Sequence, residues 1–297
     1  MLRPRRVSLT KASDRGQSNS YEEKNMTTSE PVALVTGASS GMGAVFARKF
    51  ADRGYRLLLV ARRRERLERL ADELKGDAEA LPADLTDDAD LRRIEKRISA
   101  EPRLEVLINN AGFGTLRSFC ESELEDQERM HRLHIIAILR LTHCALQGMI
   151  ARRKGSIVNV SSVAAFLHNP LSVSYGATKA WINSFTESLA VELESVGSPV
   201  RVQALCPGFT YTEFHDTLGI DRSFIPRSLW MSAEKVVEDS LRGLDSGRLI
   251  VIPGWRYRLF VDAQRWIPRR LRHAIALKYG SRNRQTLTTR TPGHQGR

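Results

Sequence analysis

Cysteine is scarce in this chain of 297 residues, which contains only Cys120, Cys144 and Cys206. Their odd number and their lack of metal-ligand spacing argue against a disulfide framework and against a metal site. We therefore expect free thiols in a reducing compartment. Cys206 precedes Pro207 at the end of an expected strand, where it is either a buried structural thiol or a neighbour of a bound cofactor.

Long apolar runs are absent as well. No stretch approaches the roughly 18 uninterrupted apolar residues that are typical of a membrane-spanning helix. The chain is 41% apolar, and 297 residues can bury one good core without requiring a second. No internal repeat is visible. The sequence therefore predicts a single core domain.

Acidic residues are outnumbered, and the formal net charge is +12. Residues 251–297 hold eleven Lys and Arg against one acid, and residues 1–28 hold six against three, which leaves 29–250 at about −1. Because the body is nearly neutral, the high pI says nothing about an active site. A nucleic-acid-binding role would rest on the basic ends alone, without a recognised module, so we expect no nucleic-acid partner.

The first 30 residues are polar, lack periodicity and are rich in Ser, Arg and Lys, so we expect a disordered extension over 1–30. Translation from Met26, close to the first expected strand, is an alternative start.

The rest of the chain alternates between strand and helix patterns. Expected strands cover 32–36, 56–61, 78–82, 104–109, 155–161, 200–206 and 249–252. Expected helices cover 42–53, 63–75, 87–100, 123–152, 175–196 and 232–244. This alternation predicts an α/β fold over 31–254, a single doubly wound Rossmann-like domain with a parallel sheet of about seven strands and helices on both faces. Ligands of such sheets bind beyond the carboxyl ends of the strands.

A glycine-rich turn, TGASSGMG (36–43), follows the first expected strand and opens the first expected helix. Glycines let the backbone approach a pyrophosphate, and the amide N–H groups of the helix start point at it. The turn is therefore either an ordinary connection or the phosphate-binding element of a dinucleotide fold.

Ser162, Tyr175 and Lys179 form a second pattern. Residues four apart on a helix share a face, so Lys179 is expected beside the Tyr175 phenol. An ammonium favours the phenolate, and a shift of about 3 pKa units would need roughly 4 kcal/mol. A serine hydroxyl from the preceding strand can hold a carbonyl or alcohol oxygen next to the phenol. An isolated YxxxK would more simply be a surface pair, but this one is accompanied by the glycine-rich turn.

Four motifs together, TGASSGMG (36–43), NNAG (109–112), Ser162 with YGATK (175–179), and PGFTYT (207–212), resemble the short-chain dehydrogenase/reductase family in order and spacing. The similarity runs from about Pro31 to Gly254 and favours the shorter, oxidoreductase branch. It implies hydride transfer between a nicotinamide cofactor and a carbonyl or alcohol. It also implies that Tyr175 is the general acid/base, that Lys179 lowers the Tyr175 pKa and contacts the nicotinamide ribose, and that Ser162 orients the substrate oxygen.

The resemblance also implies a set of cofactor-binding residues. Besides Tyr175 and Lys179, these are Thr36, Gly37, Ser39, Ser40, Gly41, Met42, Gly43, Arg62, Asp84, Leu85, Asn110, Ala111, Gly112, Pro207, Gly208, Thr210 and Thr212. Asp84 and Leu85 resemble the pair that contacts adenine in the family, and Thr212 would lie on the nicotinamide side.

Cofactor choice can be argued from the end of the second strand. Sites that prefer NAD place a carboxylate there, whereas this chain has Ala61 followed by Arg62. A guanidinium can bind a 2′-phosphate, so we expect NADP(H) rather than NAD(H). The alternative is that the arginines begin a solvated helix, which Arg63 and Arg64 in particular could do.

One position departs from the family pattern. His134 stands where the family usually has an asparagine that connects the catalytic lysine to solvent through water. Imidazole can bind water and carry protons near neutral pH, so His134 is a candidate catalytic residue. The alternative is a packed core residue whose backbone carbonyl alone keeps the water.

The substrate is expected to be a small to medium apolar carbonyl or alcohol. Ser162, Tyr175 and Phe214 are the candidate substrate residues, Phe113, Phe166, Leu167 and His168 are further wall candidates, and the insertion 209–230 has the apolar character of a lid. Phe209, Phe224, Ile225, Leu229 and Trp230 belong to that insertion and could equally be core contacts.

The C-terminal segment 255–280 interleaves apolar residues with arginines, and Pro268 is expected to divide it into two helices. It fits a cap over the protein's own pocket, a subunit contact, or a surface that lies on anionic lipid. Residues 281–297 are expected to be a disordered basic tail. We further expect a homodimer or homotetramer in the cytoplasm, with peripheral membrane contact as an alternative. The alternative to an enzyme is a non-catalytic scaffold that senses the cofactor.

Overall fold

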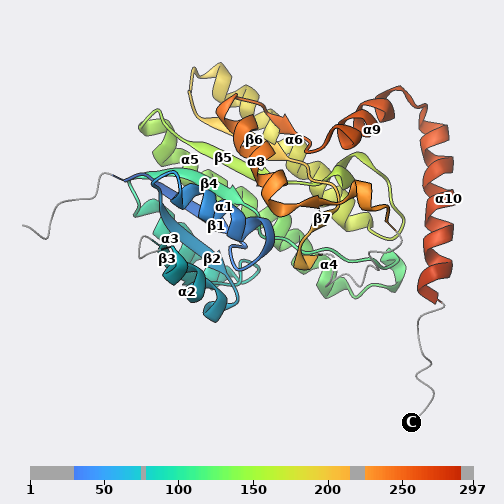
Figure 1. Cartoon of the computed structure of the whole chain (residues 1–297), viewed down its shortest axis with the longest axis horizontal. Helices are drawn as coiled ribbons and strands as arrows, with labels where there is room; N and C mark the ends of the chain where they lie inside the picture. The colour runs from blue at the N-terminus through green and yellow to red at the C-terminus, as the bar shows by residue number, and fades with distance from the viewer. Residues whose placement is uncertain (1–29, 75–77, 215–224, 289–297) are drawn as a thin grey trace, which may run out of the picture.

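The computed structural model describes residues 30–74, 78–214 and 225–288 (Figure 1). The expected N-terminal extension over 1–29, the end of the expected basic tail and Phe224 lie outside these ranges.

Seven parallel strands form one sheet in the order β3-β2-β1-β4-β5-β6-β9. They are β1 (Val32–Thr36), β2 (Arg56–Ala61), β3 (Ala78–Pro82), β4 (Leu104–Asn109), β5 (Ser156–Val160), β6 (Arg201–Leu205) and β9 (Ile250–Val251). Every one lies within its expected range. Because the strand order reverses between β1 and β4, the carboxyl ends of these two strands border the crevice where such folds bind ligands.

Helices cover both faces of the sheet (Figure 1). One face carries α1 (Gly41–Ala51), α2 (Arg64–Glu73) and α8 (Ala233–Asp245), and the other carries α3 (Asp88–Ser99), α5 (Ile138–Ala151) and α6 (Val173–Ser195). The strands alternate between these layers: Ala33 and Val35 belong to the first core, and Val32 and Leu34 to the second. This alternation is the period-two geometry of a strand whose two faces are both buried.

Local signals define several helix starts. Asp87 caps α3 by accepting hydrogen bonds from the amides of Ala89 and Asp90, both at 2.9 Å. Within α3, Leu91, Ile94 and Ile98 follow helical spacing and are buried. Ser232 caps α8 through the Lys235 amide at 3.1 Å. These signals are legible in the sequence.

The expected long helix over 123–152 is divided. It consists of α4 (Leu124–His131), a π-helical turn η3 (Arg132–Ala137) and α5. Within the described residues, Leu124–Ala151 is also the one helix long and apolar enough to cross a membrane by length and composition. Its α5 part packs on β4 and α3, as a core helix does.

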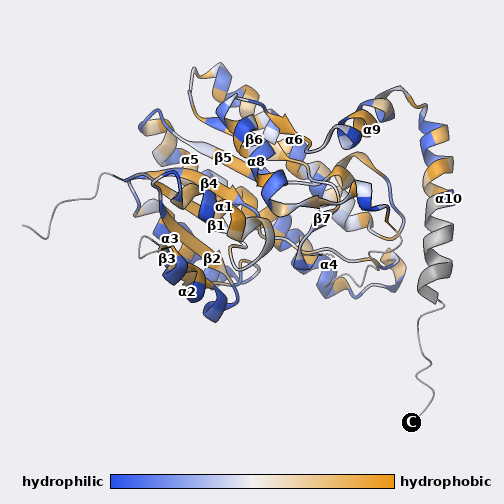
Figure 2. Cartoon of the chain, viewed as in Figure 1, coloured by the Kyte–Doolittle hydropathy of each residue, from blue (hydrophilic) through white to orange (hydrophobic). Residues whose placement is uncertain are grey.

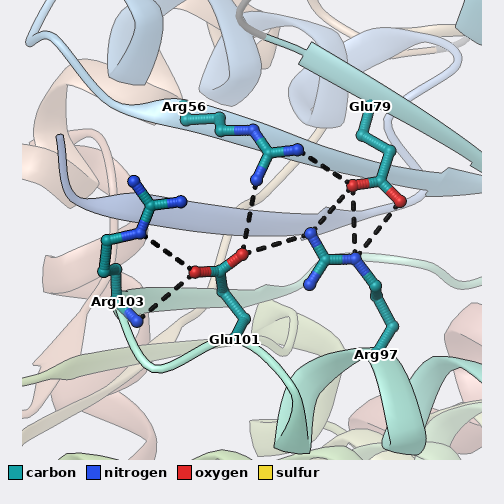
Figure 3. A network of polar contacts seen from close by, with 5 residues as sticks. All are labelled: Arg56, Glu79, Arg97, Glu101 and Arg103. Atoms are coloured by element: carbon teal, nitrogen blue, oxygen red, sulfur yellow. Dashed lines mark hydrogen bonds and ion pairs between the residues drawn. The ribbon is translucent and has the colours of Figure 1, made fainter. Parts of the chain in front are cut away.

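An ion network holds the edge of the sheet opposite the crevice. The Glu101 carboxylate, 6% exposed, contacts Arg97 at 3.1 Å, Arg103 at 3.3 Å and Arg56 at 3.4 Å. Glu79 joins Arg56 and Arg97 from β3 (Figure 3). Although burial opposes ionisation, the arginines hold the pKa of Glu101 below its usual value. The network therefore connects β2, β3 and α3 to the loop before β4.

The C-terminal helices are α9 (Trp255–Trp266) and α10 (Arg269–Thr288), with Pro268 between them as expected. Figure 2 shows the two helices as an arm at the margin of the molecule, with apolar and polar residues interleaved along α9 and the first part of α10. A disordered tail was expected from residue 281, whereas α10 continues past Gly280 to Thr288. One glycine costs a helix only about 1 kcal/mol, and the next proline is Pro292.

Candidate active site

The four motifs meet beyond the carboxyl ends of the central strands. The glycine-rich turn follows β1, NNAG follows β4, Ser162 follows β5, and PGFTYT follows β6. Parallel strands end at the same edge of a sheet, which is why segments far apart in the sequence come together here.

The glycines of the turn stand where a side chain would not fit. A Cβ at Gly43 would lie 2.2 Å from the Gly37 carbonyl oxygen, and Gly37 and Gly41 have φ of +67° and +54°. Ser40, the N-cap of α1, makes no side-chain capping bond, and the first turn of α1 has no acid. The free amide end of α1 therefore fits an anionic pyrophosphate.

Thr36 connects the turn to NNAG. Its hydroxyl donates to the Ile108 carbonyl at 3.1 Å and accepts from the amides of Asn110 and Ala111 at 2.9 and 3.0 Å. The Asn110 side chain donates back to the Thr36 carbonyl at 2.9 Å. Thr36 and Asn110 thus fix the two walls of the crevice relative to each other.

Ser162, Tyr175 and Lys179 are brought together as expected. Ser162 follows β5, its hydroxyl accepts from the Ala164 amide at 3.1 Å, and it is hydrogen-bonded to the Tyr175 phenol. Lys179 lies one helical turn after Tyr175 on α6, with its Nζ 5.7 Å from the centre of the phenol ring. That Nζ donates to the Val160 carbonyl at 2.8 Å.

The pKa values of this pair differ from the simple expectation. Burial raises the pKa of Tyr175 to about 12, against the opposing effect of the Ser162 hydrogen bond. Burial also lowers the pKa of Lys179 to about 7, with a smaller opposing effect of Cys206. Lys179 is buried and Tyr175 is half-buried, surroundings that disfavour charge, so without cofactor the lysine does not act on the phenol as a full ammonium. Tyr175 therefore keeps its proton at neutral pH.

His134 lies in the π-helical turn and is fully buried. Its Nε2 accepts from the Phe113 amide at 3.2 Å, and its Nδ1 lies 3.0 Å from the Thr178 hydroxyl. Thr178 donates its own proton to the Tyr175 carbonyl at 2.9 Å, which assigns the imidazole proton to Nδ1. Burial, followed by the nearby Lys179, holds the pKa of His134 well below its usual value. Both ring nitrogens are thus occupied in a neutral imidazole.

The arginine that reaches the glycine-rich turn is Arg63 rather than Arg62. The Arg63 guanidinium donates to Ser40 at 2.7 Å and to Ser39 at 3.1 Å, and pairs with Glu213 at 2.8 Å. Arg66 binds the same carboxylate, so the two arginines lower the pKa of Glu213 to about 2. Arg62 is exposed, with no polar contact to any described residue. The direction of the chain at the start of α2 determines which of the two adjacent arginines, Arg62 or Arg63, faces the glycine-rich turn.

The remaining cofactor candidates border the same crevice. Asp84 follows β3 and accepts from the Thr86 amide at 2.9 Å and hydroxyl at 2.8 Å, while Leu85 is buried. Thr212 approaches the glycine-rich turn, since a Cβ at Gly41 would lie 3.1 Å from its Cγ2. A Cβ at Gly112 would lie 2.9 Å from His134 Nε2, which explains the glycine of NNAG.

Two phenylalanines lie beside residues of the site, Phe214 beside Tyr175 and Phe113 beside His134. The Phe214 ring lies 5.9 Å from the Tyr175 ring, and Phe113 lies 6.0 Å from His134. Phe166 ends the short helix η4 (Val163–Phe166), directly after Ser162.

An open depression of about 470 Å³ adjoins the glycine-rich turn, with Ser39, Arg66, Thr212 and Glu213 on its wall. A second, of about 630 Å³, lies remote from the site against α3 and Arg140.

One cysteine and one tyrosine also lie next to the site. Cys206 is buried, donates to Asn183 Oδ1 at 3.3 Å and has a pKa raised by burial to about 12, so it is a structural thiol. Tyr257 of α9 lies against the PGFTYT loop, and sequence patterns did not indicate it. Among the described residues no group of His, Cys, Asp or Glu could hold a metal ion.

The doubly wound sheet, the glycine cradle and the serine–tyrosine–lysine set define a Rossmann-like dinucleotide-binding protein. A family model for short chain dehydrogenase matches residues 31–222. The chain therefore belongs to the short-chain dehydrogenase/reductase family.

Known proteins agree with this assignment. The oxidoreductase UcpA of Escherichia coli is 38% identical over 191 residues, which are 63% of this chain and 72% of that protein. The solved structure of a short-chain dehydrogenase from Sphingobium yanoikuyae in complex with NADPH has 35% identity and a TM-score of 0.72, covering 90% of this chain and 98% of that one. A bulky-bulky ketone specific alcohol dehydrogenase from Comamonas testosteroni has 30% identity and a TM-score of 0.68, covering 90% and 97%.

Proposed function

We propose that this chain is an NADP(H)-dependent oxidoreductase that interconverts a carbonyl and an alcohol on a small to medium apolar substrate. The observation that carries the proposal is the set of Ser162, Tyr175 and Lys179 at the crevice, with Phe214 beside the phenol. A cofactor-sensing scaffold would not need a phenol, a lysine and a serine held in this arrangement.

The chain's own groups perform the proton half of the reaction. The glycine-rich turn and Lys179 would hold NADPH, which would supply a hydride for the carbonyl carbon. Ser162 holds the substrate oxygen, and the Tyr175 phenol donates its proton to that oxygen as the carbon–oxygen double bond becomes single. Tyr175 is left as a phenolate, which Lys179 stabilises before a proton from solvent restores the phenol.

The protonated state of Tyr175 suits the reductive direction. A phenol with a pKa raised to about 12 is a proton donor at neutral pH, whereas alcohol oxidation requires the phenolate as the base. Oxidation should therefore be favoured at higher pH.

Apolar substrate character is supported by Phe214, whose ring lies beside the phenol. It is also supported by the similarity to a bulky-bulky ketone specific alcohol dehydrogenase. For the cofactor, the similarity to a structure holding NADPH and the cluster of Arg63 and Arg66 at the glycine-rich turn both favour NADP(H).

Replacing Tyr175 by Phe tests the function directly. Tyr175→Phe keeps the ring but removes the phenol proton that the proposed reaction uses, so we expect turnover in an NADPH-oxidation screen of aldehydes and ketones to fall at least about a hundredfold, the lower range for general acid catalysis. NADPH binding, followed by fluorescence, should persist. Full turnover by Tyr175→Phe would refute the assignment.

We propose that the protein is cytoplasmic and forms a homodimer or homotetramer. The three free cysteines support a reducing compartment. Exposed apolar residues support self-association, among them Leu139 and Ile150 on α5 and Val173 and Val191 on α6.

A second candidate role is peripheral contact with anionic lipid. The outward face of α9 exposes Trp255, Leu259 and Trp266, by 62%, 62% and 88%, beside Arg256 and Arg258. Tryptophans on an apolar stripe with arginine flanks are typical of helices that lie in a membrane interface.

A further inference from the structure

Tyr257, in the first turn of α9, bonds through one hydroxyl to two segments of the substrate side. The hydroxyl accepts from the Phe209 amide at 3.0 Å and donates to the Leu229 carbonyl at 2.7 Å. Tyr257 is 8% exposed, so these bonds compete little with water.

Those two backbone groups lie at the two ends of the insertion 209–230. From Phe209 the chain enters β7 (Thr210–Tyr211), and after the short helix η6 (Arg227–Leu229) it enters β8 (Met231–Ser232), which pairs with β7. The Met231 amide donates to the Phe209 carbonyl at 3.0 Å. Arg256, next to Tyr257, donates to the Ser228 carbonyl at 2.8 Å. The first turn of α9 thus joins the start of the insertion to its end.

The Tyr257 ring also determines the shape of the PGFTYT loop. A Cβ at Gly208 would lie 2.1 Å from the ring carbon Cζ, a distance that no side chain can occupy. Gly254, with φ of +80°, turns the chain into α9 just before the ring. Gly208 is therefore required for close packing on α9, independently of any contact with a cofactor.

The segments that α9 holds reach the reacting groups. Phe214, a few residues after Phe209, lies beside Tyr175, and α9 also packs on η4, which follows Ser162. One wall next to the substrate position, η4, is therefore in contact with α9. The other wall, Phe214, is separated from the α9 contact at Phe209 by the short strand β7.

We infer that Tyr257 is a positioning residue that fixes the substrate side of the active site through Phe209 and Leu229, making α9 part of the catalytic apparatus. This inference rests on the proposed function for its effect on turnover. The contact itself is independent of that function, because it can be measured without a substrate.

The first test is backbone hydrogen exchange, read by mass spectrometry on peptides covering 207–214 and 225–232 of the full chain. Tyr257→Phe keeps the ring on Gly208 but removes both hydroxyl bonds, so exchange at the Phe209 amide should rise about three- to tenfold. Tyr55→Phe is the matched control: it removes another half-buried hydroxyl, beside Phe50 and outside the site, and should leave these peptides unchanged. Equal exchange in Tyr257→Phe and the wild type would overturn the inference.

The second test is the split between binding and turnover. With the apolar ketone that the wild type reduces best, Tyr257→Phe should raise KM about three- to tenfold while the Kd for NADPH stays within twofold. A loss of NADPH affinity with an unchanged KM would overturn the inference by placing the effect on the cofactor side. If the wild type reduces no carbonyl, the proposed function fails, while the exchange experiment still decides the contact.

Discussion

His134 touches three parts of the site at once: the loop after NNAG through the Phe113 amide, α6 through Thr178, and the Tyr175 ring at 5.9 Å. A proton relay needs a nitrogen that is free to exchange its proton, and here both nitrogens are engaged in a dry interior. This geometry favours the packing alternative over the relay. The residue type alone left both open, because the same imidazole can do either.

The pH dependence of stability tests that interpretation. The unfolded imidazole binds a proton below about pH 6.5, whereas the buried folded one, with its pKa well below that value, resists it. Wild-type stability should therefore fall as the pH drops below 6.5, and His134→Asn should reduce that part of the fall.

His134→Leu leaves the Phe113 amide without its acceptor and removes the hydrogen bond that the imidazole donates to Thr178, so we expect a loss of about 2–4 kcal/mol in the free energy of unfolding. Its kcat should keep the wild-type pH profile. These are measured by denaturant unfolding at pH 8 and 5.5 and by steady-state kinetics. A changed pH profile of kcat in His134→Leu, restored in His134→Asn, would instead support the relay.

Two adjacent arginines give a second residue-scale prediction. The sequence favoured Arg62 for the 2′-phosphate, but the Arg63 guanidinium lies on Ser39 and Ser40. If Arg63 holds the phosphate, Arg63→Ala should weaken NADPH binding by about 1.5–3 kcal/mol and change NADH binding little. Arg62→Ala is the matched control, measured by the same fluorescence titrations. The reverse order of effects would restore the original assignment of Arg62.

At the scale of elements, the sheet and most helices follow from local patterns, whereas irregular elements do not. All seven strands lie in their expected ranges because apolar runs with flanking turns are local signals. The π-helical turn at 132–137 is confined to six residues. This is too short a segment to be recognised from the periodicity of apolar residues. The β7–β8 pair joins two-residue strands from the two ends of the insertion, too short to show a strand pattern.

The ion network around Glu101 is also an element-scale feature (Figure 3). Its charges come from the start of β2, the start of β3, α3 and the following loop. Nothing in the sequence around these charged residues indicates that they contact one another. Only the parallel sheet brings these strand starts together, at the edge that faces away from the crevice.

At the scale of the whole molecule, the open question is the role of the C-terminal arm, α9 and α10. It is a cap over the pocket, a subunit contact or a surface that binds lipid. The inward face of α9 is buried at Tyr257 and Val261, as a cap requires, whereas the outward face exposes tryptophans between arginines. We expect full-length protein to cosediment with anionic vesicles and to be released by salt, since each basic residue near such a surface adds about 1 kcal/mol.

The controls are neutral vesicles and the variant Trp255→Ser/Trp266→Ser, which removes exposed rings and leaves Tyr257 in place. Loss of binding in this variant supports the lipid surface. No binding by the full chain, together with a dimer that dissociates in the same variant by analytical ultracentrifugation, contradicts it and assigns the face to a second subunit.

The sequence by itself determined the fold class and the family, and it predicted the serine, tyrosine and lysine as the reacting residues, because these depend on short-range periodicity and on motifs of fixed spacing. Tertiary structure decided which arginine meets the glycine-rich turn, whether His134 has a free nitrogen, how burial moves the pKa values of Tyr175 and Lys179, and that Tyr257 lies on Gly208. Each of these depends on groups distant in the chain or on the exclusion of water. Neither exists until the strands and helices have packed.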